Sequence, residues 1–286
     1  MLKGVYTALV TPFNRDGSVD FGALKNLLKI QIDSGIHGLV PVGTTGESPT
    51  LDTSEKEKII QAAVEAAAGR IPVIAGTGGN NTGAAVEATR RARDLGADFT
   101  LQVTPYYNKP SEEGLYRHFS EIADKGGLPV VLYNVPGRSA VGMSSALILR
   151  LAENSGIVAV KEASGSITGI MELLNRRPAG FSVLSGDDAL TLPLMGCGGE
   201  GVISVASNMF PREMVELTES LLKGDYDHAK EIHNRLYPFF INQFIETNPV
   251  PIKTYMASQG LMEEIFRLPL CPLKEGNRKV LLSTFA

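Results

Sequence analysis

The sequence has few of the residues and patterns that mark several large protein classes. Its two cysteines, Cys197 and Cys271, lie far apart and form no CxxC pair, so they predict no disulfide framework. Its four histidines show no spacing typical of metal ligands, and we expect no metal site. No apolar run approaches the length of a membrane span.

Neither sign of charge is in large excess. The 27 lysines and arginines are offset by 31 aspartates and glutamates, which gives a net charge of −4, and no long basic block occurs. Nucleic acids and anionic membranes are therefore not expected as partners. Because the sequence shows neither a signal peptide at Met1 nor a disulfide framework, we expect a cytoplasmic location.

What the sequence does contain is a regular succession of short apolar runs. Runs of this kind predict buried strands. Their starts are about 20 to 35 residues apart, a spacing that suits one strand, one helix and two turns. The eight expected strands are 5–10, 38–42, 72–75, 99–103, 129–133, 157–160, 182–185 and 201–205.

The segments between these runs carry the end signals of helices. Asp20 can cap a helix over 21–34, and Asp52 with Glu55 makes a capping box for a second helix. Thr82 is expected to open a third. Later helices are expected to open at Ser144, Ser166 and Asp187, and helices without intervening strands are expected over 226–246 and 250–261.

Eight alternations of strand and helix predict a parallel (β/α)8 TIM barrel. The alternative is an open doubly wound sheet, which would have a glycine-rich phosphate turn after its first strand. Residues 10–13 are not such a turn. We therefore expect a catalytic barrel over 1–223 and a C-terminal helical domain over 224–286.

Polar residues follow several of the expected strands at their carboxyl ends. Barrel enzymes act at these ends, so the side chains there should face one shared pocket. Lys161 follows the sixth apolar run, where it is either a solvated strand end or an amine held against an apolar wall. Desolvation disfavours an ammonium group, and a neutral amine can form a Schiff base with a ketone.

The other strand ends also allow two interpretations. The segment 43–47, GTTGE, is either a polar turn or a carboxylate site built from backbone N–H groups and threonine hydroxyls. Arg138 is either a surface residue or a bidentate ligand for a carboxylate. Asp187 and Asp188 are expected to cap a helix rather than bind a metal, and Glu162 is expected to be a hydrogen-bond partner.

Three segments taken together resemble the pyruvate-dependent class I aldolases of the dihydrodipicolinate synthase and N-acetylneuraminate lyase family. They are GTTGE at 43–47, YNVPGR at 133–138 and VKEA at 160–163, and the likeness extends from residue 4 to about residue 272. The resemblance implies a (β/α)8 barrel with a C-terminal helical domain and no cofactor. It implies condensation of pyruvate with L-aspartate 4-semialdehyde on the route to lysine and diaminopimelate.

The resemblance also implies four catalytic residues. Lys161 matches the lysine that forms the imine with pyruvate, and Tyr133 matches a tyrosine that transfers protons. Thr44 matches the hydroxyl that links two tyrosines into a relay. Tyr107 matches the relay tyrosine that crosses from a neighbouring subunit.

Four further positions match residues that bind the substrates. Thr45 matches a ligand of the pyruvate carboxylate, and Arg138 matches the arginine that binds the semialdehyde carboxylate. Gly186 and Ile203 match residues that line the pyruvate site. The resemblance further implies a homotetramer built as a dimer of dimers.

One departure concerns feedback inhibition. Family members that lysine inhibits carry histidine and glutamate side chains at a dimer-interface site, where this sequence has Thr53, Lys56 and Ala84. Asn80 and Tyr106 are kept. Because a cation site that gains a lysine should bind lysine poorly, we expect weak or absent inhibition.

Three other functions remain alternatives. An N-acetylneuraminate lyase or 2-keto-3-deoxy sugar-acid aldolase would share the fold and the imine, but these relatives generally lack an arginine at the position of Arg138. A non-catalytic barrel protein would have no need to keep Lys161. A phosphate-binding barrel would place a glycine-rich turn after its last strand, whereas 196–199 precedes that strand.

Overall fold

The computed structural model describes residues 1–285 and contains one sheet of eight parallel strands. The spatial order of the strands is β2-β1-β8-β7-β6-β5-β4-β3. The strands are β1 (Gly4–Ala8), β2 (Gly38–Val40), β3 (Ile74–Gly76), β4 (Phe99–Val103), β5 (Val130–Asn134), β6 (Ile157–Glu162), β7 (Ser182–Ser185) and β8 (Gly201–Ser204). All eight predicted strands are confirmed.

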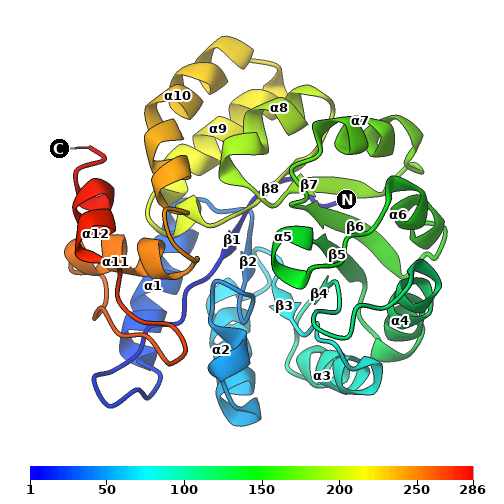
Figure 1. Ribbon diagram of the computed structural model, residues 1–286, viewed down its shortest axis with the longest axis horizontal. Coiled ribbons are helices and arrows are strands. Elements are labelled where there is room, and N and C mark those ends of the chain that lie inside the picture. Colours follow the sequence, from blue (N-terminus) through cyan, green and yellow to red (C-terminus); the bar gives the residue numbers. More distant parts are fainter. Residues whose placement is uncertain (286) are drawn as a thin grey trace.

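The two end strands of this order approach each other and nearly close the sheet. Leu39 of β2 forms an isolated parallel bridge with Val73, just before β3, and its N–H donates to the carbonyl of Pro72 at 3.0 Å. The N–H of Gly76 donates to the carbonyl of Pro41 at 3.0 Å. Helices surround the strands, so the predicted (β/α)8 barrel is confirmed (Figure 1).

Twelve α-helices occur among residues 1–285. They are α1 (Phe21–Asp33), α2 (Thr53–Ala67), α3 (Thr82–Asp94), α4 (Glu112–Gly126), α5 (Pro136–Ser139), α6 (Ser145–Leu151), α7 (Ile167–Arg176), α8 (Thr191–Gly196), α9 (Pro211–Lys223), α10 (Tyr226–Asn242), α11 (Val250–Ser258) and α12 (Glu275–Leu282). Three short 3-10 helices are η1 (Ser48–Thr50), η2 (Asp188–Leu190) and η3 (Ala206–Asn208).

The helix ends follow the capping chemistry read from the sequence. The Asp20 carboxylate accepts from the N–H of Ala23 at 2.9 Å at the start of α1. Asp52 and Glu55 form the predicted capping box of α2, with reciprocal bonds of 2.8 and 3.0 Å. At α3 the cap is Asn81 and Thr82 is the first helical residue, so the helix begins where predicted with a different cap.

Alternate residues of the strands point to two different cores. One set fills the barrel interior and includes Val131 and Tyr133 of β5 and Ala159 of β6. The other set, such as Val130 and Val160, packs against the surrounding helices. Because side chains of a strand alternate between faces, the residue two positions after Ala159 also points inward. That residue is Lys161.

Helices without intervening strands follow β8, as expected. Two of them end earlier than the sequence indicated. Helix α10 ends at Asn242, where the N–H groups of Phe244 and Ile245 bond three residues back in tight turns. Helix α11 ends at Ser258 because Gly260 adopts a left-handed φ of 72°. Helices α10, α11 and α12 lie together on one side of the molecule (Figure 1). None of the helices within residues 1–285 combines the length and the hydropathy of a membrane span.

Candidate active site

Lys161 lies inside the barrel at the carboxyl end of β6. Lys161 is only 5% exposed, and its Nζ lies 4.3 Å from the centroid of the Tyr133 ring. The two residues are direct neighbours in the parallel pairing of β5 with β6. No salt bridge to Lys161 occurs within residues 1–285. The predicted nucleophile is therefore a buried amine beside a phenol, and not a solvated strand end.

Gly186 lies against this amine, just after β7. Its N–H donates to the carbonyl of Glu162 at 2.8 Å, which draws the turn close to β6. A Cβ at this position would lie 3.0 Å from Cε of Lys161 and 2.7 Å from Cβ of Ala163. Only glycine leaves room for the lysine side chain as it stands.

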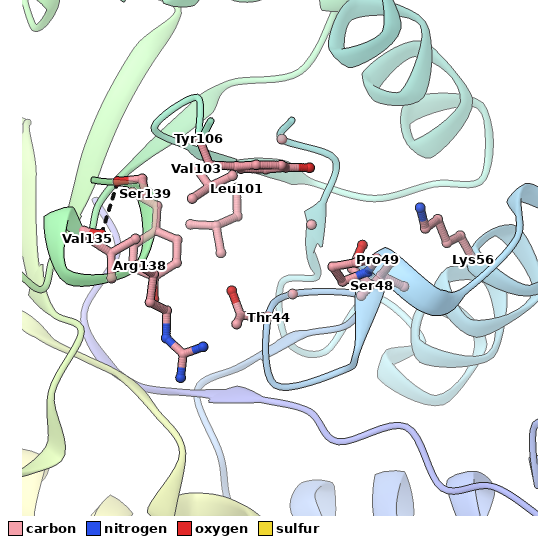
Figure 2. Close-up of a pocket in the computed structure, with 15 residues that line it drawn as sticks. Thr44, Ser48, Pro49, Lys56, Leu101, Val103, Tyr106, Val135, Arg138 and Ser139 are labelled. Carbon is pink, nitrogen blue, oxygen red and sulfur yellow. Dashed lines mark hydrogen bonds between the residues drawn. The ribbon is translucent and has the colours of Figure 1, made fainter. Parts of the chain in front are cut away.

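A cavity of about 280 Å³ opens at the carboxyl ends of the strands. Thr44, Tyr106, Tyr133 and Arg138 line it together with apolar side chains. Figure 2 shows Thr44, Arg138 and Tyr106 arranged around this space, with Lys56 beyond Ser48 and Pro49. Lys161 does not line the cavity directly and adjoins it through Tyr133. Three residues of the predicted site, from the ends of β2 and β5, thus share one cavity.

The loop after β2 carries two predicted site residues. Thr44 lines the cavity, whereas Thr45 is buried and does not line it. The Thr45 hydroxyl oxygen accepts from the side-chain amide of Asn248 at 2.9 Å. Because the oxygen accepts that bond, the hydroxyl hydrogen remains free to donate to a carboxylate. The loop is flanked by Val42 and Glu47, which both have left-handed φ angles, 59° and 54°.

Arg138 reaches the cavity from the short helix after β5. Pro136 ends the strand and starts α5, since proline fits the first turn of a helix and lacks the N–H that a strand would use. One terminal nitrogen of the guanidinium donates to the carbonyl of Asn248 at 3.2 Å. The rest of the guanidinium fork stays available for a carboxylate.

The acidic residues near Lys161 serve mainly as hydrogen-bond acceptors. Asp187 caps η2, and burial raises the pKa of its carboxyl, with Asp188 adding to the rise and Lys161 opposing it. Asp188 accepts from the N–H groups of Val205 and Ala206 at 3.0 Å each. The expected capping role is confirmed for Asp187, whereas Asp188 joins the start of η2 to the residues that follow β8.

Glu162 accepts hydrogen bonds from two neighbours. The side-chain amide of Asn134 donates to it at 2.9 Å, and the N–H of Ser164 donates at 2.6 Å. The expectation that Glu162 is a hydrogen-bond partner is confirmed.

Tyr107 stands apart from the other predicted site residues. It is 91% exposed, has a left-handed φ of 73° and does not line the cavity of its own chain. Its neighbour Tyr106 is the tyrosine of this pair that lines the cavity. Ile203 lies in the barrel interior on β8, in the same apolar cluster as Tyr133. In the single chain, Thr44, Tyr133 and Arg138 therefore share the cavity, and Lys161 lies next to Tyr133 with Gly186 against its side chain. Thr45 and Ile203 are buried and do not line the cavity, and Tyr107 lies outside this group.

Comparison with known proteins identifies the family. The model of the dihydrodipicolinate synthetase family matches residues 1–285. The chain belongs to this family.

Members of the dihydrodipicolinate synthetase family resemble the chain along its whole length. The 4-hydroxy-tetrahydrodipicolinate synthase of Pelobacter propionicus is 50% identical over 281 residues, covering 98% of this chain and 97% of the relative. The solved dihydrodipicolinate synthase of Aquifex aeolicus is 48% identical with a TM-score of 0.96, covering 99% of this chain and 96% of that one.

A second solved relative was determined with a bound ligand. The chloride-inhibited dihydrodipicolinate synthase of Acinetobacter baumannii, complexed with pyruvate, is 42% identical with a TM-score of 0.97, and the match covers 99% of this chain and 98% of that chain. These relatives are named as synthases, so the synthase interpretation holds over the sugar-acid lyase alternative.

A second cavity of about 300 Å³ adjoins the first. The two share Lys56 and Tyr106 in their linings. Thr53, Asn80 and Ala84, the other positions that the sequence associated with feedback inhibition, also line this second cavity. Burial lowers the pKa of the Lys56 ammonium, nearby Arg91 lowers it further, and Asp52 opposes the shift.

The sequence did not identify Asn248 as part of the site. This residue contacts both Thr45 and Arg138 from 203 and 110 positions away in the chain. Its only local signal is the Asn-Pro dipeptide, which predicts a turn and carries no information about distant partners.

Proposed function

We propose that the chain condenses pyruvate with L-aspartate 4-semialdehyde through a Schiff base on Lys161, as a 4-hydroxy-tetrahydrodipicolinate synthase. The observation that carries this proposal is a buried lysine beside Tyr133 at the carboxyl end of a barrel strand, in a chain of this family. The pyruvate complex of the Acinetobacter baumannii relative supports the choice of the first substrate.

The reaction begins when the neutral Lys161 amine attacks the ketone carbon of pyruvate and a C–N bond forms. Loss of water gives an imine, which on protonation withdraws electrons from the adjacent methyl group. A methyl proton leaves, and the resulting enamine carbon attacks the aldehyde carbon of the second substrate. The product then leaves the lysine when its own amine replaces Nζ at the imine carbon.

Each step needs a proton donor or acceptor near Nζ. The ring of Tyr133 lies beside Nζ, with its centroid 4.3 Å away, and Thr44 borders the cavity that Tyr133 also lines. We assign the third member of the relay to Tyr107 of a neighbouring subunit, because in its own chain this side chain is exposed and lies outside the cavity. Acid–base help of this kind typically contributes about 10²–10⁴-fold in rate.

Two groups are assigned to the substrate carboxylates. The Thr45 hydroxyl is assigned to pyruvate and the Arg138 guanidinium to the semialdehyde, with Gly186 and Ile203 shaping the pyruvate site. Holding both carboxylates fixes the distance between the reacting carbons and so converts a bimolecular step into an effectively unimolecular one. The reaction requires no cofactor.

The wider setting follows from the reaction. The product belongs to the biosynthesis of lysine and diaminopimelate, and we propose that the enzyme acts in the cytoplasm. We propose a homotetramer made of two dimers, with residues 1–223 as the catalytic barrel and 224–286 as a helical domain. The exposed Tyr107 supports at least the dimer.

Borohydride trapping tests the proposal. Incubation with pyruvate and borohydride should add a reduced pyruvate group to the peptide that contains Lys161, as measured by mass spectrometry. Lys161→Ala should abolish the adduct, whereas Lys56→Ala, which removes the amine that lines the cavity, should keep it. An adduct that persists in Lys161→Ala would refute the assignment. Activity with N-acetylneuraminate but not with the semialdehyde would refute the substrate pair.

A further inference from the structure

A fully buried ion pair joins the loop after β2 to helix α11. The Nζ of Lys253 donates to one carboxylate oxygen of Glu47, and neither side chain is exposed to solvent. The other oxygen of Glu47 accepts from the backbone N–H of Arg267 at 3.3 Å. Nothing in the reaction above uses either charged group.

Two aromatic rings surround the ammonium group of Lys253. Its Nζ lies 4.3 Å from the centroid of the Phe13 ring and 5.1 Å from that of Phe266, in positions where ring faces attract a cation. Burial lowers the pKa of Lys253 to about 8, and Glu47 opposes this shift. Three separate parts of the chain, which contain Phe13, Lys253 and Phe266, therefore meet around the carboxylate of Glu47.

The loop itself needs an anchor of this kind. Val42 and Glu47 bracket residues 43–46, and both hold left-handed backbone angles that non-glycine residues rarely adopt. For the β-branched Val42 the angle is a clear outlier. Such conformations persist only where surrounding contacts enforce them. The N–H of Glu47 also donates to the carbonyl of Thr44 at 3.1 Å, which transmits the position of Glu47 to the site residue.

A second contact from the same part of the chain reaches the loop. Asn248, five residues before Lys253, donates to the Thr45 hydroxyl and accepts from Arg138 through its carbonyl. The segment that leads into α11 thus contacts the groups assigned to both substrate carboxylates.

We propose that Glu47 and Lys253 are positioning residues, whose buried pair fixes the Thr44–Thr45 loop in the geometry that binds pyruvate and relays its protons. The inference rests on the proposed function, because it assigns roles to Thr44 and Thr45. It extends that function to the C-terminal helices, which place the loop without touching the substrate.

The double variant Glu47→Gln/Lys253→Met separates positioning from stability. Replacing both members of a buried ion pair by apolar groups of similar volume is often neutral for folding, whereas removing one charge leaves the other unpaired. Methionine supplies the apolar volume of Lys253, and the glutamine oxygen can still accept from the N–H of Arg267. The double variant should therefore melt close to the wild type. Its kcat/KM for pyruvate should fall by about 10²-fold, with KM raised, because a displacement of about 1 Å in a site can have this effect.

The largely buried pair Arg177–Glu200 provides the matched control. These side chains are 18% and 9% exposed, and they join the end of α7 to the start of β8, far from the carboxyl ends of the strands. Arg177→Met/Glu200→Gln should leave KM for pyruvate unchanged. Hydrogen exchange gives a readout independent of activity: amides of residues 43–50 should exchange faster in the Glu47/Lys253 double variant only.

Two results would overturn the inference. If KM and kcat of the double variant equal those of the wild type, the pair has only a structural role. Unchanged hydrogen exchange of the amides of residues 43–50 would lead to the same conclusion. Should the double variant fail to fold, Glu47→Asp keeps both charges and shortens the link by one methylene. A wild-type KM in that variant would equally refute positioning. If the wild-type protein does not form the borohydride-trapped adduct with pyruvate, the proposed function is refuted, and the inference that rests on it is refuted too.

Discussion

The contact between Gly186 and Lys161 gives the most direct test of the site. In Gly186→Ala the new Cβ would lie 2.7 Å from Cβ of Ala163 and 3.0 Å from Cε of Lys161. Ordinary carbon–carbon contacts are about 3.5–4.0 Å, so these groups must separate by roughly 0.5 to 1.3 Å. Any movement of the lysine stem displaces the amine from Tyr133.

Gly186→Ala is expected to lower both the unfolding free energy and kcat. Overpacking of this size typically costs about 1–3 kcal/mol of unfolding free energy. A displacement of about 1 Å at a reacting group can lower the rate by about 10²-fold, so kcat for the condensation should fall by a factor of this order. The rate of borohydride trapping at saturating pyruvate should fall with it.

Two further variants isolate the cause. Gly186→Ala/Ala163→Gly removes the shorter contact and keeps the one with Lys161, so stability should recover while kcat stays low. Gly276→Ala is the matched control, because a Cβ at this position in α12 meets no atom within 4 Å. Its kcat should equal that of the wild type. A wild-type kcat in Gly186→Ala would refute the argument that this glycine makes room for the nucleophile.

Three other predictions follow from the structure. Lysine in the micromolar range should leave the initial rate unchanged, because Lys56 and Arg91 repel its ammonium groups in the second cavity; strong inhibition would contradict this. Tyr107→Phe should lower kcat by about 10²-fold or more if its hydroxyl completes the relay, and an unchanged kcat would remove it from the mechanism. Burial lowers the pKa of His118 to about 4 in the folded chain, against 6.5 in the unfolded chain. As the pH falls from 6.5 towards 4, the unfolded chain therefore binds a proton at His118 that the folded chain does not, and the folded state loses stability. His118→Gln should therefore reduce the loss of unfolding free energy between pH 7 and pH 5 by about 2 kcal/mol in urea titrations, and an unchanged loss would contradict the shift.

The barrel and its inner face could be read from the sequence because both depend on local periodicity. Apolar runs at regular spacing give the strands, and alternation within β5 and β6 places Tyr133 and Lys161 on one face. Parallel pairing then puts the two residues side by side. These inferences need only the order of strands in a barrel.

The support of the site could not be read in the same way. The Glu47–Lys253 pair joins residues 206 positions apart, and no local pattern distinguishes Lys253 from the other lysines. The same holds for Asn248, which reaches Thr45 across 203 positions. Such contacts depend on how the C-terminal helices fold back on the barrel, and that arrangement is set by packing between distant segments.

The role proposed for Tyr107 would link assembly to catalysis in this chain. A large aromatic side chain that is almost fully exposed gains nothing from burial in the single chain, and its left-handed φ adds a backbone cost of about 1–2 kcal/mol. Both features are consistent if a second copy covers the tyrosine and receives its hydroxyl. The nucleophile and the carboxylate ligands then belong to one subunit and the end of the proton relay to another. Dissociation should consequently lower kcat while leaving Lys161 and Tyr133 in place.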